Sequence, residues 1–277
     1  MLSLFLAPLP WLDGPCDDPR YPVLDGAWVV GCGSSGDVDR ALNLDTGERV
    51  ELSRGLEAPA IGGGVLYVAG TRGGLWRLPE PEPDHEMVRI PVTGHAPPAT
   101  DGVHVVVVTD HDLQTLEIGQ RNRYHTEGTP APWYPPAVST GWLAWVDVGA
   151  QDARGEDVLA YDRETREVRE LAVGPLDERH VALSGDHAAW IDDEGVTIQH
   201  LRTGEQQRVS SDPRPARRLS LDGDVACWEH WNGTDVDVWC SDGVLVDGDG
   251  DQRSPSRVGD RVLYVDAERT FLATVER

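Results

Sequence analysis

Arginine and histidine side chains recur at one place in a repeating pattern, and they are the residues best suited to bind a ligand. The set comprises Arg20, His95, Tyr134, Arg179, His180, Arg217, Arg218 and Arg253. Guanidinium groups donate paired hydrogen bonds to carboxylates and phosphates, so a cluster of these residues predicts a site for an anionic group. The same arginines would instead join structural elements if each paired with a nearby aspartate, and the sequence leaves both interpretations open.

A second set of polar residues follows the short apolar run of each repeat. It consists of Asp110, His111, Asp112, Asp147, Asp152, Asp192, Asp193, Glu229, His230 and Asp266. Carboxylates repeated in this way can surround a calcium ion, but they more often cap strand ends at the solvent, and we adopt the second interpretation. We add His111, His230 and Trp231 to the predicted ligand-binding residues, because His can exchange protons and an exposed Trp can anchor a partner.

The sequence lacks the motifs of common enzymes and metal proteins. It contains no Gly-x-Ser-x-Gly, His-Glu-x-x-His, phosphate-binding loop or dinucleotide fingerprint, and no Cys/His spacing typical of zinc. Asp247, Asp249 and Asp251 resemble the start of a calcium loop, but Gln252 replaces the expected Gly, and we predict a hairpin of an outer strand there. We expect a binding or scaffold protein without metal or cofactor. The alternative is a hydrolase or lyase that uses His and Asp residues of the same region.

The composition limits the partners of the protein. The 277 residues include 24 basic side chains, all of them arginine, and 48 acidic ones, which gives a formal net charge of -24. Such a surface repels a phosphate backbone, so we expect no nucleic-acid partner. The longest apolar stretch, Leu2 to Leu12, contains two prolines and is too short to span a bilayer. We expect one monomeric domain over residues 1–277 that binds a protein partner or a small anionic ligand.

Seven copies of one pattern account for most of the chain. In each copy, two turn residues such as Gly185-Asp186 are followed four positions later by Trp, Tyr or Val. These marker residues are Val30, Tyr67, Val106, Trp145, Trp190, Trp228 and Tyr264. Their spacing of 36 to 45 residues is typical of a four-stranded propeller blade, and short β-branched runs such as Val103 to Val108 exclude helical repeats.

Strands can be placed within a single repeat. In the fourth, we predict strands near 136–139 and over 142–148, 157–162 and 167–172, with a turn at 163–165 that matches 44–47 and 201–204 in other repeats. Gly in such a turn supplies a positive φ. Small residues stand eight positions before each marker, as the crowded centre of a propeller requires. They are Pro22, Pro59, Pro98, Ala137, Ala182, Ser220 and Ser256.

The sequence thus predicts an all-β, seven-bladed β-propeller with four antiparallel strands per blade. The seventh repeat supplies strands near Val258, over 262–266 and over 271–275, and it lacks a fourth. We expect Ser3 to Leu9 to complete this last blade as a closure strand, because pairing there removes two open sheet edges. The alternative for residues 1–12 is a signal-peptide remnant, but they lack a positively charged start and a clear cleavage site.

The four cysteines can form two disulfides. Cys227 and Cys240 flank a hairpin with a four-residue loop at 232–235, which places them directly opposite each other on neighbouring strands. Cys16 and Cys32 could join the N-terminal segment to the first blade. Two such bonds favour a periplasmic or extracellular location, with single buried thiols of a cytosolic protein as the alternative.

Two segments of the chain resemble a known repeat. Residues 185–205 read GDHAAWIDDEGVTIQHLRTGE, and residues 141–171 read GWLAWVDVGAQDARGEDVLAYDRETREVREL. Their turn, Trp-x-Asp strand end and following strand are similar to the TolB-like β-propeller repeat, with the strongest match over residues 137–243. The resemblance implies a propeller that binds protein partners in the periplasm, while related propellers serve as lyases or as accessory domains of peptidases.

Overall fold

β-Strands make up nearly all of the secondary structure that is described for this chain, as its short apolar runs predict. The computed structural model describes residues 3–9, 12, 23–32, 38–51, 56–62, 65–70, 75–78, 88–90, 98–108, 113–117, 123–126, 130–131, 134–148, 155–174, 176, 178–211, 217–266 and 269–276. No helix in these ranges has the length and hydrophobicity needed to cross a membrane.

The described strands form seven antiparallel sheets of four strands each. The first contains β2 (Val23–Asp25), β3 (Trp28–Cys32), β4 (Val38–Asn43) and β5 (Arg49–Glu51). The second contains β6 (Leu56–Gly62), β7 (Val65–Gly70), β8 (Leu75–Leu78) and β9 (Val88–Ile90). The third contains β10 (Ala99–Thr100), β11 (His104–Val108), β12 (Leu113–Glu117) and β13 (Arg123–Thr126).

The remaining sheets follow the same order, except at the two ends of the chain. The fourth contains β14 (Ala137–Val138), β15 (Trp142–Asp147), β16 (Asp157–Asp162) and β17 (Glu167–Ala172). The fifth contains β18 (Arg179–Ser184), β19 (His187–Asp192), β20 (Gly195–His200) and β21 (Gln206–Ser210). The sixth contains β22 (Arg217–Asp222), β23 (Val225–Trp231), β24 (Val236–Cys240) and β25 (Leu245–Val246). The seventh contains β26 (Gln252–Val258), β27 (Arg261–Asp266), β28 (Arg269–Glu276) and β1 (Ser3–Pro8).

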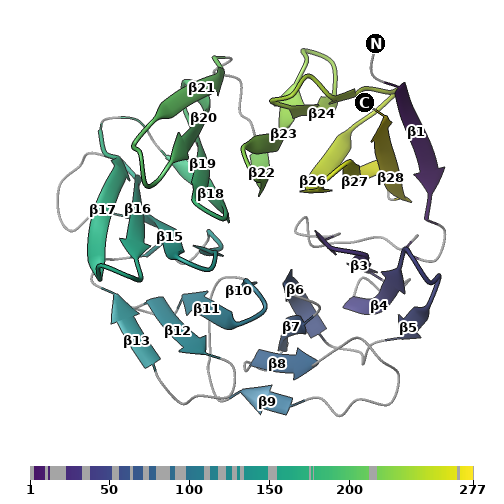
Figure 1. Cartoon of the computed structure of the whole chain (residues 1–277). Coiled ribbons are helices and arrows are strands. Elements are labelled where there is room, and N and C mark those ends of the chain that lie inside the picture. The colour runs from purple at the N-terminus through teal and green to yellow at the C-terminus, as the bar shows by residue number, and fades with distance from the viewer. Residues whose placement is uncertain are drawn as a thin grey trace.

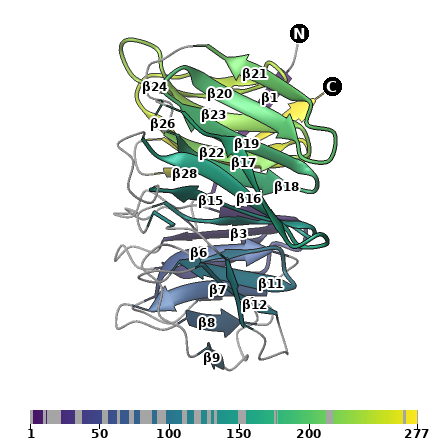
Figure 2. The same cartoon turned by 90° about the vertical axis from the view of Figure 1, so that its left-hand side faces the viewer.

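Successive sheets follow one another around a common centre, as Figure 1 shows. Each sheet runs outward from its first strand, so β6, β10, β18, β22 and β26 lie nearest the centre. Figure 2 shows the same arrangement from the side. The predicted all-β class and the four-stranded antiparallel unit are confirmed.

The fourth sheet tests the strand positions predicted from the sequence. Its third and fourth strands, β16 and β17, have the predicted bounds, while β15 is one residue shorter at its C-terminal end. The first strand, β14, contains only two residues. This strand is preceded by Pro135 and Pro136, which lack the N–H group that a longer ladder would need.

The hydrophobic core consists of separate clusters, each between two neighbouring sheets. Trp145 packs against the third sheet, Trp190 against the fourth, Trp228 against the fifth and Tyr264 against the sixth. Each of these marker residues therefore fills the space between its own sheet and the preceding one. Their burial is nearly complete, with exposed fractions of 1 to 3%. In the fourth to seventh sheets, the repeat in the sequence thus corresponds to one large aromatic side chain per sheet interface.

The N-terminal segment joins the seventh sheet to the first. β1 pairs antiparallel with β28 along its whole length, from Ser3 opposite Glu276 to Pro8 opposite Phe271. Farther along, Leu12 is fully buried in a cluster with Leu24 of the first sheet and Leu263 of the seventh. The Thr270 hydroxyl also donates to the carbonyl oxygen of Leu12 at 3.3 Å.

The predicted Cys227–Cys240 disulfide is present, and its two residues lie directly opposite each other on β23 and β24. The four-residue loop at 232–235 is closed by a hydrogen bond from the Asn232 amide to the Asp235 carbonyl oxygen. Cys16 lies outside the described residues, and of Cys32 only the backbone is described, so the second predicted disulfide stays a prediction.

The segment 247–251 differs from the hairpin predicted for it. The outer strand β25 ends at Val246, and the hairpin turn precedes it, at residues 241–244. Residues 247–251 instead form the loop that leads into β26. The side chain of Asp251 accepts a hydrogen bond from the Val236 amide at 3.0 Å, so this loop packs on the adjacent end of β24.

Leu12→Ala tests whether the contact between the N-terminal segment and the first sheet stabilises the fold. Removing a fully buried leucine side chain leaves a cavity between two sheets and should lower the free energy of unfolding by about 2–5 kcal/mol. Denaturant titration followed by tryptophan fluorescence measures this loss. Leu245→Ala, at a leucine that is 37% exposed, is the matched control and should change stability by much less. Equal effects of the two substitutions would contradict the inference that the buried Leu12 side chain stabilises the contact between the N-terminal segment and the first sheet.

Candidate functional site

The structure describes most, but not all, of the predicted site residues. Tyr134, Arg179, His180, Arg218, Arg253, His230 and Trp231 are described with their side chains. Arg217 is described by its backbone alone, in β22. Arg20, His95 and His111 lie outside the described residues.

Four of the innermost strands contain a register shift near their first residues. The register of β6, β18, β22 and β26 against the next strand shifts at this point. In the last three, the bulge residues His180, Arg218 and Ser254 have positive φ angles of 48°, 57° and 55°. A left-handed conformation costs a non-glycine residue about 1 kcal/mol or more, so its repetition at three equivalent positions indicates a constraint on where these side chains point.

The bulge residues form the centre of a group that we name the mouth cluster. It consists of Tyr134, Arg179, His180, Arg218, Glu229 and Ser254. Arg218 pairs through Nε with the buried Glu229 carboxylate at 3.2 Å, and its Nη1 donates to the Ser254 hydroxyl at 3.4 Å. The Ser254 amide donates to the same Glu229 oxygen at 2.8 Å. Glu229 thereby fixes residues of two neighbouring sheets relative to each other.

His180 lies within electrostatic range of the guanidinium groups of Arg179 and Arg218. Its ring lies edge-on to the Tyr134 ring, with centroids 5.2 Å apart. Burial, together with the positive charges of Arg218 and Arg179, lowers the pKa of His180 to about 4. The imidazole is therefore neutral at physiological pH, and the formal positive charge of the mouth cluster resides on the two arginines.

Carboxylates partner the predicted arginines within their own sheets. Arg179 contacts Asp193 at 3.1 Å, and Arg253 is paired with Asp251. The three predicted arginines whose side chains are described therefore belong to ion pairs, as one of the two interpretations of the sequence expects, but these pairs lie within sheets rather than between them. Other contacts of the mouth cluster join neighbouring sheets. The His180 ring contacts the Tyr134 ring, and Arg218 donates to the Ser254 hydroxyl.

His230 and Trp231 are the last two residues of β23, the second strand of the sixth sheet. The His230 side chain is 5% exposed and stacks on Trp239, with ring centroids 4.2 Å apart. Trp231 is 37% exposed at the end of β23.

The acidic residues at the strand ends hold neighbouring protein groups. Asp192 accepts two hydrogen bonds of 2.8 Å from Arg208, and Asp147 accepts one of 3.0 Å from the Trp145 indole. Within the described ranges, no group of three or more His, Cys, Asp or Glu side chains could hold a metal ion.

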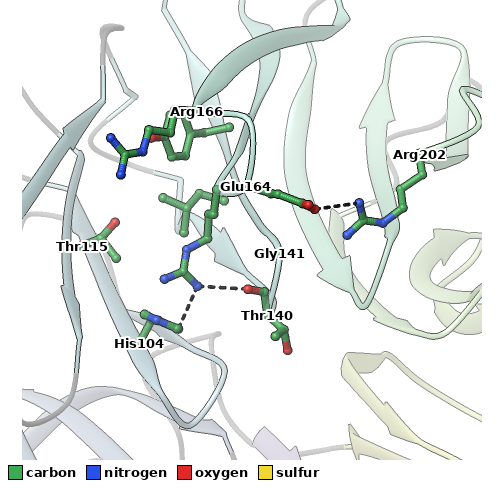
Figure 3. A pocket seen from close by; sticks show the side chains of 10 residues that line it. His104, Thr115, Thr140, Gly141, Glu164, Arg166 and Arg202 are labelled. Atoms are coloured by element: carbon green, nitrogen blue, oxygen red, sulfur yellow. Dashed lines mark hydrogen bonds and ion pairs between the residues drawn. The ribbon is translucent and has the colours of Figure 1, made fainter.

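A second candidate site lies at the opposite ends of the strands. A cavity of about 410 Å³ opens between the third and fourth sheets (Figure 3). Its lining includes His104, Thr115, Arg163 and Arg166. None of these residues is among the site residues predicted from the sequence. The available signal was the turn after β16, which carries arginines where the matching turns carry Leu and Gly.

His180→Asn tests the electrostatics of the mouth cluster. The folded state resists protonation of His180 until pH 4, whereas the unfolded chain takes up the proton near 6.5, so stability falls with pH between these values. At pH 5 the loss is roughly 2 kcal/mol. The melting temperature of the unaltered chain should therefore fall from pH 7 to pH 5, and that of His180→Asn should fall less.

His187→Asn, in β19 and outside the mouth cluster, is the control for this measurement. It should keep the full acid-dependent decrease of the unaltered chain. Three identical pH profiles would show that His180 contributes nothing to the acid sensitivity.

Comparison with known proteins shows the fold. No known sequence family matches the chain, and no curated protein matches it. BamB from Moraxella catarrhalis is 15% identical, with a TM-score of 0.55 over 99% of this chain and 100% of that one. The β-propeller domain of the Trilobed protease from Pyrococcus furiosus is 9% identical, with a TM-score of 0.64 over 93% of each chain. An oligogalacturonate lyase in complex with manganese is 13% identical, with a TM-score of 0.62 over 99% of this chain and 91% of that one. The chain has the fold of a β-propeller.

Proposed function

We propose that the chain forms a single closed propeller of seven TolB-like blades, in which β1 completes the last blade. The seven four-stranded sheets and the pairing of β1 with β28 support this arrangement. The propeller of the Trilobed protease has an open velcro topology, and the N-terminal pairing distinguishes the present chain from it. The resemblance of residues 137–243 to the TolB-like repeat supports the family assignment.

We further propose that the mouth cluster is the binding site of a scaffold propeller. Its ligand is an anionic group, either of a small molecule or on the surface of a partner protein. The observation that carries this proposal is the left-handed bulge at His180, Arg218 and Ser254, which brings side chains of three successive sheets to one place. The charge of Arg179 and Arg218 suits carboxylate or phosphate.

Catalysis at the same place, as in a hydrolase or lyase, is the alternative function. A general acid or base works best when its pKa is near the working pH. His180 has a pKa lowered to about 4 and is flanked by arginines rather than by an orienting carboxylate, which favours binding over proton transfer. The solved relatives include both kinds of protein, BamB and an oligogalacturonate lyase.

The proposed location is the periplasm or the extracellular space, with the protein as a monomer. The Cys227–Cys240 disulfide supports an oxidising compartment, since the cytosol keeps thiols reduced. Purification from the native organism without reductant, followed by peptide mapping, would show whether this bond forms in the cell.

Isothermal titration of the full chain with a panel of anions, including acidic peptides, tests the mouth cluster. Replacing Arg179 and Arg218 by Gln removes two charged donors, so the affinity of a true ligand should fall by about tenfold or more. Arg261→Gln, which breaks an exposed pair with Asp45, is the matched control and should bind normally. Absence of binding by every anion, or equal binding by the double variant, would contradict the proposal.

A further inference from the structure

The cavity between the third and fourth sheets is built from residues of both. His104 and Thr115 come from the third sheet, while Tyr161, Arg163 and Arg166 come from the fourth. Its volume of about 410 Å³ lies within the range of roughly 300–1,000 Å³ that is typical of small-ligand pockets. Its rim is formed by the turn between β14 and β15 and the turn between β16 and β17. These turns lie at the opposite end of the strands from the mouth cluster, so the cavity faces away from it.

The turn after β16 departs from its two counterparts at the positions that line the cavity. The turns at 43–47, 162–166 and 200–204 share the same backbone hydrogen bond, from the fifth residue's amide to the first residue's carbonyl oxygen. The second residue is Leu44 or Leu201 in two of them, and the fifth is Gly47 or Gly204. In the fourth sheet both positions carry arginine, at Arg163 and Arg166, and both side chains line the cavity.

Arg166 adopts a left-handed backbone conformation. Glycine occupies the equivalent position in the two counterpart turns. The φ of Arg166 is 64°, against 73° for Gly47 and 76° for Gly204. An arginine in this place adds backbone strain that a glycine would avoid. Within the described part of the chain, no carboxylate pairs with Arg166, although the protein carries twice as many acidic as basic residues. The strained turn therefore holds the Arg166 guanidinium, with its positive charge, at the rim of the cavity.

Arg163 is held in place by one of its nitrogen atoms. Nη1 lies 2.8 Å from Nδ1 of His104 and donates to the carbonyl oxygen of Thr140 at 3.2 Å, as the dashed lines in Figure 3 mark. His104 is itself fixed by Asp101, whose Oδ2 lies 3.0 Å from the same Nδ1 and 3.9 Å from Nη1 of Arg163. A guanidinium has five N–H donors. The remaining donors of Arg163 make no hydrogen bond with the described residues, so they can bind a ligand.

Thr115 adds a buried hydroxyl group to the lining of the cavity. Its side chain is 1% exposed and lines the cavity, and its Oγ1 has no partner among the described residues. Leaving a buried hydroxyl unpaired costs about 1–3 kcal/mol. A ligand hydroxyl could satisfy it, because the threonine hydroxyl both donates and accepts.

The third arginine at this site is part of the protein's own network. Arg202 donates to both oxygens of Asp186 at 2.9 Å and contacts Glu164 at 3.4 Å, a pair visible in Figure 3. Hydrogen bonds from the Trp142 indole and from Arg202 lower the pKa of the Asp186 carboxyl. Arg202 therefore frames the cavity, whereas Arg163 and Arg166 make no side-chain hydrogen bond to a carboxylate of the described residues.

We propose that this cavity binds a small hydroxylated organic anion of monosaccharide size, such as a sugar phosphate or a sugar acid. Arg163 and Arg166 bind its phosphate or carboxylate group, and Thr115 bonds one of its hydroxyl groups. Tyr161 and Leu143 provide apolar surface for the carbon skeleton.

Isothermal titration of the full chain with glucose 6-phosphate, glucuronate, inorganic phosphate and glucose tests this proposal. We expect glucose 6-phosphate or glucuronate to bind, and glucose to bind far more weakly. Arg163→Gln and Arg166→Gly should each weaken binding at least tenfold, and Thr115→Val should weaken it several-fold. Arg166→Gly also restores the glycine of the counterpart turns, so its melting temperature should not decrease, which separates lost binding from lost folding.

Two matched variants isolate the site. Thr197 occupies the same place in β20, with an exposed fraction of 1% and an unpartnered Oγ1, but it does not line this cavity. Thr197→Val and Arg261→Gln should therefore bind normally. No binding of either organic anion at millimolar concentration, equal binding of glucose, or unchanged binding by Arg163→Gln and Arg166→Gly would overturn the proposal. Binding of inorganic phosphate alone would also overturn it.

Discussion

Neighbouring sheets pack face to face through apolar clusters from the third sheet to the seventh and from the seventh to the first, and the rest of the structure depends on this packing. A four-stranded sheet cannot bury both of its faces alone. Trp145, Trp190, Trp228 and Tyr264 fill successive interfaces, and the alternation of side chains along each strand presents the next residues to the opposite neighbour. The loops at either end of the sheets are then free to carry polar residues without weakening the core.

Both candidate sites use the backbone in the same way. At the mouth cluster, bulges place His180, Arg218 and Ser254 in a left-handed conformation, and at the cavity a turn does the same for Arg166. These are the four non-glycine residues with positive φ in the described part of the chain. All of them lie at strand ends, where the packed sheets can hold a conformation that an isolated loop would avoid.

The sequence carried more information about the repeat than about the sites. The bounds of β16 and β17 could be predicted because the turn between them has a recognisable local pattern. The bulges could not, since His180, Arg218 and Ser254 share neither size nor charge. The departure of Arg163 and Arg166 from Leu and Gly is visible in the sequence. The cavity itself depends on His104, which lies 59 residues before Arg163, and such a contact follows only from the packing of two sheets.

The pairing of β1 with β28 places Ser3 directly opposite Glu276. A linker of a few residues would therefore connect the two ends of the chain as an ordinary hairpin. The polypeptide could then be cut in an exposed turn such as 203–205, giving a circular permutant whose new ends lie on the fifth sheet. In that molecule the strands of the seventh sheet would be continuous in sequence, and the order in which sheets assemble during folding would change while the final packing stayed the same.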